Sequence, residues 1–199
     1  MVRTPSTDVE EELLRAAEEI LAAEGPSGLT VRKVAHGAGV APMGVYSRFD
    51  GKHGLLEVLF VRGCRQLQTT IAAAKGPDAT SRLRDSCLRY REFAVAHPQR
   101  YRLMFERMHE VEPGPEALQE AFSAFEHLVQ LVTMARAHQP LGRGTDVDVA
   151  QQIWSALHGA VSLELLGIGF TENPAATYSS LVDALLSGLA ATATDTSLQ

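Results

Sequence analysis

Helical spacing of apolar residues runs through nearly the whole sequence, and this feature limits the possible fold more than any other. Between residues 8 and 23, for example, Leu13, Ala17, Ile20 and Leu21 recur every three or four positions and form one apolar stripe. No run of Val, Ile or Thr alternates with polar residues between turn-forming residues, as a strand would require. The sequence therefore predicts an all-α protein.

Glycine and proline divide this helical pattern into segments. Gly-Pro-Ser-Gly at 25–28, Gly-Ala-Gly at 37–39 and Asp-Gly at 50–51 separate three helices from a long helix that begins at Lys52. The expected helices are residues 8–23, 31–37, 42–49, 52–74, 81–97, 98–110, 115–136, 146–170 and 174–193. We expect two domains, a three-helix domain of residues 1–51 and a larger helical bundle of residues 52–199.

The composition is that of an ordinary globular protein of 199 residues, with 45% hydrophobic residues and a net charge of −6. Any DNA contact must therefore come from a local basic patch. The acidic N-terminus does not resemble a secretory signal, and no uncharged apolar run is long enough to span a bilayer. The two cysteines, Cys64 and Cys87, have no CxxC spacing and are expected to be reduced thiols in a cytoplasmic protein.

Residues 29–56 contain two short helical segments separated by a sharp turn. Val34 lies on the inward side of the first segment, and Val45 and Phe49 lie on that of the second. Gly39 can adopt the positive φ that the turn requires. This layout is typical of a helix-turn-helix, whose second helix enters the major groove of DNA.

The same residues resemble the head of the TetR family of transcription regulators. The matching pattern comprises Thr30, Val34-Ala35, Ala38-Gly39-Val40, Tyr46-Ser47-Arg48-Phe49 and Lys52-His53-Gly54-Leu55. The resemblance implies a regulator, commonly a repressor, that binds a double-stranded DNA operator as a homodimer and is released by a small molecule bound in its C-terminal domain. It implies that the DNA-binding residues are Thr30, Arg32, Lys33, Pro42, Met43, Gly44, Tyr46, Ser47, Arg48 and Lys52.

Local charge agrees with this interpretation. Four basic residues and one acidic residue between Thr30 and Leu55 give this stretch a charge of +3 within a chain of −6. A phosphate backbone favours such a patch because binding releases counterions. Met43 and Gly44 stand where relatives often have polar residues, so we expect an apolar contact of Met43 with a thymine methyl group and a share of DNA-shape readout.

A second resemblance lies about a hundred residues further along. Trp154, His158 and Gly159 resemble a C-terminal domain type with a Trp-x-x-x-His-Gly signature. Trp154 and His158 are four residues apart and share one helical face. His158 is open to three interpretations: a core residue bonded to a carbonyl, a ligand contact or a metal ligand. The other histidines have no metal-binding spacing, and we expect neither a metal nor a cofactor.

Large apolar residues cluster in the middle helices. Most of them are expected to form the core, and some are expected to line a pocket for an apolar or aromatic effector, since helical bundles often hold small molecules between helices. The residues predicted to bind the effector are Tyr90, Met104, Phe105, Met108, Phe125, Trp154 and His158.

The last two helices are rich in Leu, Val, Ala and Gly. Val161, Leu165, Ile168, Leu181, Leu185, Leu186 and Leu189 are too many to be buried in one chain, so these helices are expected to form a four-helix dimer interface. A helical adaptor that binds protein instead of DNA would use the same apolar faces, but it would leave the basic residues near Tyr46 without a role. Enzyme motifs such as GxSxG, HExxH and a phosphate loop are absent, so no enzyme is expected.

Overall fold

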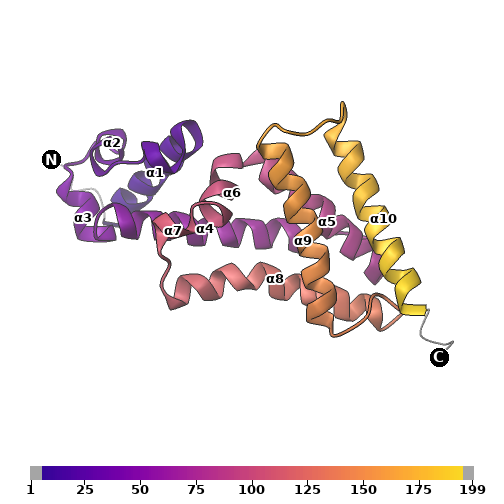
Figure 1. Ribbon diagram of the computed structural model, residues 1–199. Coiled ribbons are helices and arrows are strands. Elements are labelled where there is room, and N and C mark those ends of the chain that lie inside the picture. Colours follow the sequence, from indigo (N-terminus) through magenta and orange to yellow (C-terminus); the bar gives the residue numbers. More distant parts are fainter. Residues whose placement is uncertain (1–5, 195–199) are drawn as a thin grey trace. The chain divides into compact units, whose positions relative to one another are not determined.

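The computed structural model describes residues 6–194 and contains ten α-helices and no strand in that range (Figure 1). The helices are α1 Ser6–Gly28, α2 Val31–Gly37, α3 Met43–Phe49, α4 Lys52–Ala72, α5 Ala79–Ala96, α6 Pro98–Phe105, α7 Met108–Val111, α8 Pro115–Arg136, α9 Asp146–Leu165 and α10 Pro174–Thr194. The predicted all-α class is confirmed. Among these residues, no helix is long and apolar enough to cross a membrane.

The chain forms two compact units that alternate along the sequence. The first unit comprises the residues up to Cys64 together with His97–Glu120, and the second comprises Arg65–Ala96 and the residues from Ala121 onward. Helices α4 and α8 each cross the boundary, so that one end of the helix lies in the first unit and the other end in the second. Because α6 and α7 belong to the first unit, this unit contains more than the three helices of residues 1–51.

The first unit is built around apolar faces of short helices. Leu13 and Leu14 of α1, Val34 of α2, Val45 of α3 and Phe60 of α4 all have 2% or less of their surface exposed. Helix α1 bends at Gly25, whose φ of 71° interrupts the helical backbone just before Pro26. The stop that the sequence predicts at residues 25–28 is therefore present as a kink followed by one more turn.

The prediction of one helix over residues 98–110 is wrong, because the structure has two helices there. Helix α6 ends at Phe105, and both the Glu106 and Arg107 amides donate to the carbonyl of Arg102. The short α7 then ends at Val111, and the next residue, Glu112, adopts a left-handed φ of 46°. No glycine or proline marks the break at 106–107, so the sequence contains no local signal for it.

The second unit packs α5 against α9 and α10. The Arg91 guanidinium of α5 binds the Glu164 carboxylate of α9 through two hydrogen bonds of 2.8 and 2.6 Å. The Tyr178 hydroxyl of α10 donates to the Cys87 carbonyl over 3.0 Å. Burial raises the pKa of both thiols, Cys64 and Cys87, to about 12, so both are protonated at neutral pH.

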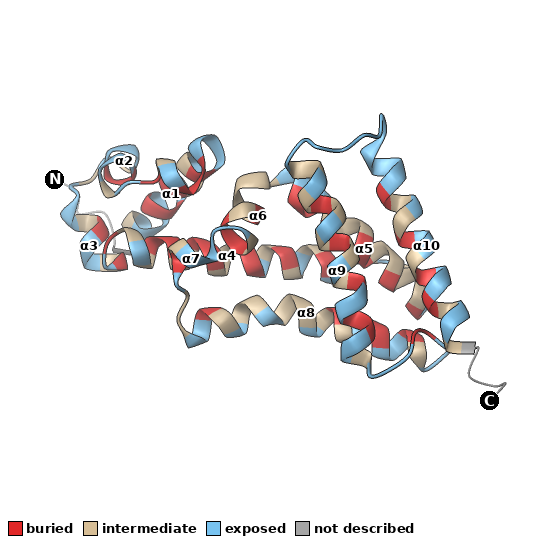
Figure 2. Ribbon diagram, viewed as in Figure 1, coloured by how far each residue is buried: buried red, intermediate tan, exposed pale blue. Residues whose placement is uncertain are grey.

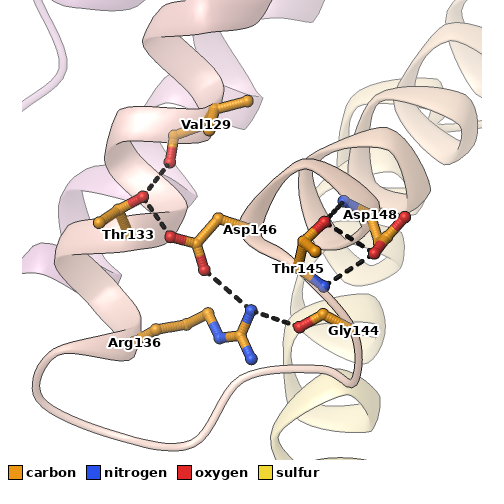
Figure 3. Close-up of polar contacts among 7 residues, drawn as sticks. All are labelled: Val129, Thr133, Arg136, Gly144, Thr145, Asp146 and Asp148. Atoms are coloured by element: carbon orange, nitrogen blue, oxygen red, sulfur yellow. Dashed lines mark hydrogen bonds and ion pairs between the residues drawn. The ribbon is translucent and has the colours of Figure 1, made fainter.

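The start of α9 is held by a cluster of polar contacts (Figure 3). Thr145 caps the helix by accepting from the Asp148 amide, and the Asp148 carboxylate accepts in return from the Thr145 amide over 2.7 Å. Asp146 accepts hydrogen bonds from Thr133 and Arg136, both at the end of α8. These contacts fix the α8–α9 corner and the loop of residues 137–145.

Helix α9 ends earlier than the sequence indicates. It was expected to continue to residue 170, but Gly167 adopts a φ of 69° and its amide donates to Glu164, while the Ile168 amide donates to Leu163. This paired arrangement is the Schellman motif, which stops a helix at a left-handed residue. Residues 166–173 therefore form a loop with apolar side chains.

Candidate DNA-binding interface

Helices α2 and α3 form the predicted helix-turn-helix. Thr30 is the N-cap of α2, and its hydroxyl accepts from the Lys33 amide over 3.2 Å. The turn places Gly39 at a φ of 67°, and the Val40 amide then donates to the Ala35 carbonyl over 2.9 Å. The backbone thus reverses within a few residues, and α3 begins at Met43.

Helix α3 has one buried and one exposed face (Figure 2). Val45 and Phe49 are 0% and 6% exposed and attach the helix to the core. Met43 and Tyr46 are 71% and 55% exposed, and Ser47 is also exposed. These side chains lie largely outside the core and are therefore accessible to a partner on this face of α3.

Arg48 lies along the same helix. Its guanidinium donates to the Gly44 carbonyl and to the Ser47 hydroxyl, both over 3.3 Å, and its side chain is half-buried. These bonds turn the arginine toward the beginning of α3, where Met43 and Gly44 are located. This places its positive charge beside the exposed face.

The start of α4 is set by a close approach to the end of α3. A Cβ atom at Gly54 would lie 1.9 Å from the carbonyl oxygen of Phe49, so only glycine fits there. Asp50 and Gly51 connect the two helices with left-handed φ values of 53° and 89°. As a result, Lys52 stands at the first residue of α4, next to the C-terminal end of α3.

One contact in this region involves a residue that the sequence did not single out. The Lys33 ammonium group of α2 forms an ion pair with the Glu24 carboxylate of α1. Both side chains are about half exposed. In contrast, Arg32 is exposed and makes no ion pair within residues 6–194. Glu24 and Lys33 are nine residues apart, on opposite sides of the kink in α1, and no local pattern connects them.

The predicted DNA-binding residues therefore lie in one region of the first unit. Seven of them are exposed: Thr30, Arg32, Lys33, Pro42, Met43, Tyr46 and Ser47. Gly44, Arg48 and Lys52 are half-exposed. Their contact with DNA remains a prediction.

Four of the predicted effector-binding residues come together in the second unit. The Tyr90 hydroxyl of α5 lies 3.2 Å from Nδ1 of His158 on α9. The Trp154 ring lies 5.6 Å from the His158 ring and 6.0 Å from the Phe125 ring of α8, between ring centres. The arrangement combines aromatic rings with a hydrogen-bonded polar pair, and effector binding there remains a prediction.

The other three predicted effector-binding residues, Met104, Phe105 and Met108, belong to the first unit. Met104 is 2% exposed, Phe105 packs on Tyr101 with ring centres 4.7 Å apart, and Met108 is 38% exposed. No group of three or more His, Cys, Asp or Glu residues could hold a metal ion in the part of the chain that the structure describes.

Comparison with known protein families matches both parts of the chain. Residues 13–59 match the family described as bacterial regulatory proteins, tetR family. Residues 83–185, half of the chain, match the tetracyclin repressor-like C-terminal domain. The chain belongs to the TetR family.

Solved structures share the fold. A protein with unknown function from Rhodococcus sp. RHA1 superposes with a TM-score of 0.83 and 25% identity, over 92% of this chain and 95% of that one. A tetR-family regulatory protein from Rhodococcus RHA1 has a TM-score of 0.69 and 19% identity, covering 89% and 96%. A TetR family transcription regulator from Marinobacter aquaeolei VT8 has a TM-score of 0.69 and 18% identity, covering 93% and 98%. No curated protein matches the sequence.

Membership in the TetR family makes the chain a DNA-binding transcription regulator with a helix-turn-helix head, and not an enzyme. The resemblance found in the sequence is thereby confirmed at the level of the family. The Trp-x-x-x-His-Gly type of C-terminal domain stays a prediction. Nothing among these findings supports the adaptor alternative.

Proposed function

We propose that this TetR-family chain is a cytoplasmic repressor that binds its operator as a homodimer and is released by a small apolar or aromatic effector. The exposed face of α3 is the observation on which the proposal depends. Met43 and Tyr46 are held in solvent there, with Arg48 and Lys52 beside them. Tyr46, Thr30 and Lys52 bind phosphate oxygens, and Met43, Gly44 and Ser47 approach base edges.

The dimer forms through α9 and α10 in this proposal. Leu163, Leu166 and Ile168 are 53% to 59% exposed, although they follow the buried Val161 on the same segment. Gly159 and Gly188 have no atom within 4 Å of the place that a Cβ would occupy, so both helices have open, flat positions. Such positions let helices of a second copy pack closely, and a two-fold pair of helices forms a four-helix interface.

The effector acts by preferring one of two arrangements of the dimer. In the DNA-bound arrangement the two α3 helices are spaced about 34 Å apart, one turn of the double helix. An effector held in the second unit by Tyr90, Phe125, Trp154 and His158 favours an arrangement that does not fit the operator. It shifts the balance only by the difference between its affinities for the two arrangements.

A titration against the DNA upstream of the chain's own coding sequence tests operator binding. Lys52→Gln should weaken binding to all duplexes similarly and reduce the slope of log affinity against log salt by about one. Lys75→Gln removes the same charge from the loop after α4 and is the matched control, which should bind like the wild type. Equal behaviour of the two variants, or no preference for any duplex, would contradict the proposal.

Release is tested by screening apolar and aromatic compounds for those that raise the melting temperature of the protein. A compound that stabilises the wild type should also dissociate it from the duplex, because the effector binds the released arrangement more tightly. Tyr90→Phe removes only the hydroxyl that faces His158 and should reduce the thermal shift. A compound that stabilises the protein and strengthens DNA binding would indicate activation instead of repression.

A further inference from the structure

The hydrogen-bond donors at the beginning of α3 are engaged within the helix itself. The Gly44 amide donates to the Ala41 carbonyl over 2.8 Å, and the Val45 amide donates to the Pro42 carbonyl over 3.1 Å. Pro42 has no amide hydrogen of its own. A base edge that approaches this turn therefore finds the Gly44 and Val45 amides already bonded.

The two polar side chains in the second half of α3 also bond to the helix. The Ser47 hydroxyl donates to the Gly44 carbonyl over 3.2 Å, so its single hydrogen is used. The Arg48 guanidinium donates to the same carbonyl and to the Ser47 oxygen, both over 3.3 Å. An arginine that reads guanine directs its N–H groups at the base edge. In this structure the Nη1 group of Arg48 is directed at the backbone of α3 instead.

The side chains that remain exposed at the beginning of α3 are apolar. Met43 is 71% exposed, and Ala41 and Pro42 before it are also exposed. None of these three side chains can donate a hydrogen bond. Gly44 is half-exposed and carries no side chain, so Met43 provides the long side chain that reaches outward here.

Two of the residues proposed to hold phosphate lie at the opposite end of α3. A Cβ atom at Gly51 would lie 3.2 Å from Cε1 of Tyr46, so the Tyr46 ring is placed against the connection between α3 and α4. Lys52 begins α4 directly after this connection, whereas Met43 is the first residue of α3. Phosphate contacts position a protein on DNA and base contacts give specificity. The arrangement assigns these two roles to different ends of α3.

We propose that α3 recognises pyrimidines by their 5-methyl groups, and that Met43 is the specificity-determining residue. This inference rests on the proposed function and names the chemical feature that the operator must present. The thymine methyl group lies in the major groove, where an apolar side chain can cover it. Because 5-methylcytosine carries the same group, methylation of a cytosine at this position should substitute for thymine. The sequence points only to a thymine contact, whereas the bonds within α3 leave the methyl group as the feature that is read.

The test uses the duplex that the full-length protein selects from a random pool, with each thymine of a half-site replaced in turn by deoxyuridine. Deoxyuridine lacks only the methyl group and keeps the hydrogen-bonding groups of thymine. At one position or more, binding should weaken by about fourfold, as expected for the loss of one buried methyl group. Fluorescence anisotropy at a fixed salt concentration measures each affinity.

Cytosine provides the second arm of the test. Replacement of the same thymine·adenine pair by cytosine·guanine should weaken binding, because the methyl group is lost. A 5-methylcytosine at that position should recover most of the lost affinity, although its other major-groove group is the N4 donor of cytosine and not the O4 acceptor of thymine.

Met43→Ala should bind the thymine and deoxyuridine duplexes equally, because the side chain that covers the methyl group is gone. Met134→Ala is the matched control, since it removes the same side chain from an exposed position of α8. This variant should retain the preference for thymine over deoxyuridine. The comparison of duplexes in the wild type needs no variant, so the test does not depend on how either variant folds.

Modified purines test the alternative of hydrogen-bonded readout. 7-Deazaadenine and 7-deazaguanine lack the N7 acceptor that a side-chain donor uses in the major groove. Because the donors of α3 are engaged within the helix, these bases should leave the affinity nearly unchanged.

The inference is overturned if deoxyuridine is bound as tightly as thymine at every position, or if 5-methylcytosine behaves like cytosine. It is also overturned if Met43→Ala keeps the preference for thymine, or if a 7-deazapurine weakens binding as much as deoxyuridine does. Failure to select any duplex would instead contradict the proposed function.

Discussion

Whether a basic side chain in the head is available for phosphate depends on its acidic neighbours. Arg32 and Lys33 are adjacent on α2, and both are exposed. Only Lys33 is paired with Glu24. For Lys33 to bind a phosphate it must give up this partner, and a half-exposed ion pair is worth roughly 0–1 kcal/mol. Two neighbouring charges of equal sign therefore have unequal value for DNA binding.

Single substitutions test this difference. Arg32→Ala should weaken binding to a selected duplex more than Lys33→Ala does, because Lys33 loses the Glu24 pair when it turns to DNA. Glu24→Gln should strengthen binding to any duplex at low salt by roughly two- to fivefold, the equivalent of an exposed pair of up to about 1 kcal/mol. Fluorescence anisotropy at several salt concentrations measures all three. An Arg32→Ala variant that binds better than Lys33→Ala would show that the pairing does not matter.

At the level of single residues, the sequence predicts which side chains are buried better than it predicts which side chains pair with one another. The inward positions Val34, Val45 and Phe49 and the positive φ of Gly39 followed from helical spacing and turn chemistry, and the structure confirms them. The Lys33–Glu24 ion pair could not be predicted from the sequence pattern, because it depends on how the chain turns at Gly25. Contacts between residues that are distant in sequence require the packed fold, which periodicity does not encode.

The same contrast holds for whole helices. Helices α2 and α8 have the predicted bounds, since an N-cap or proline precedes each one. The break between α6 and α7 and the end of α9 at Leu165 were missed. At the first place no residue with special backbone preferences occurs. At the second, Gly167 was present, but the apolar residues on either side of it continued the helical pattern.

The caps at the α8–α9 corner predict a measurable stability effect. Thr145→Ala removes the N-cap hydroxyl of α9 and should lower the free energy of unfolding by about 1 kcal/mol. Ser155→Ala removes an exposed hydroxyl within the same helix and should change it by less than about 0.5 kcal/mol. Urea unfolding at one fixed protein concentration measures both. Equal effects of the two substitutions would contradict a capping role.

The capping contribution should also depend on pH. Hydrogen bonds from Thr145 hold the pKa of the Asp148 carboxyl below its ordinary value of 3.8. The ionised carboxylate therefore stabilises the folded state above pH 3.8, and this contribution is lost as the pH falls through the lower folded-state pKa. The difference between the wild type and Thr145→Ala should accordingly be constant near neutrality and decrease only in strong acid.

At the scale of the whole molecule, the two units are joined by three passages of the chain. Two of them, in α4 and α8, are continuous helices, and the third is the Ala96-His97 step between α5 and α6. A division at residue 51 follows the sequence pattern of the head, but compactness in three dimensions also depends on α6 and α7. Sequence periodicity identifies helices and does not reveal that a later segment returns to an earlier unit.

The apolar residues of the last two helices differ in exposure, and Leu165, Leu181 and Leu185 are intermediate. Val161, Leu186 and Leu189, which were expected at a dimer interface, are 0%, 8% and 7% exposed and belong to the core of one chain. Ile168 is 53% exposed, and Leu163 and Leu166, which the sequence did not single out, are similarly exposed. Together with the fully exposed Phe170, these side chains form an exposed apolar group at the end of α9 and in the loop after it.

If a second copy covers this surface, polar substitution there should separate the dimer. Leu163→Ser combined with Leu166→Ser should produce monomers at micromolar concentration in sedimentation velocity, because each side chain loses roughly 1.5–3 kcal/mol of burial in each protomer. Phe122→Ser, on α8 and 59% exposed, is the matched control and should remain dimeric. The monomeric variant should also bind the duplex far more weakly, since one head contacts only one half-site. A double variant that stays dimeric would place the interface on another face, and a wild type that is monomeric would remove the two-fold dimer from the mechanism altogether.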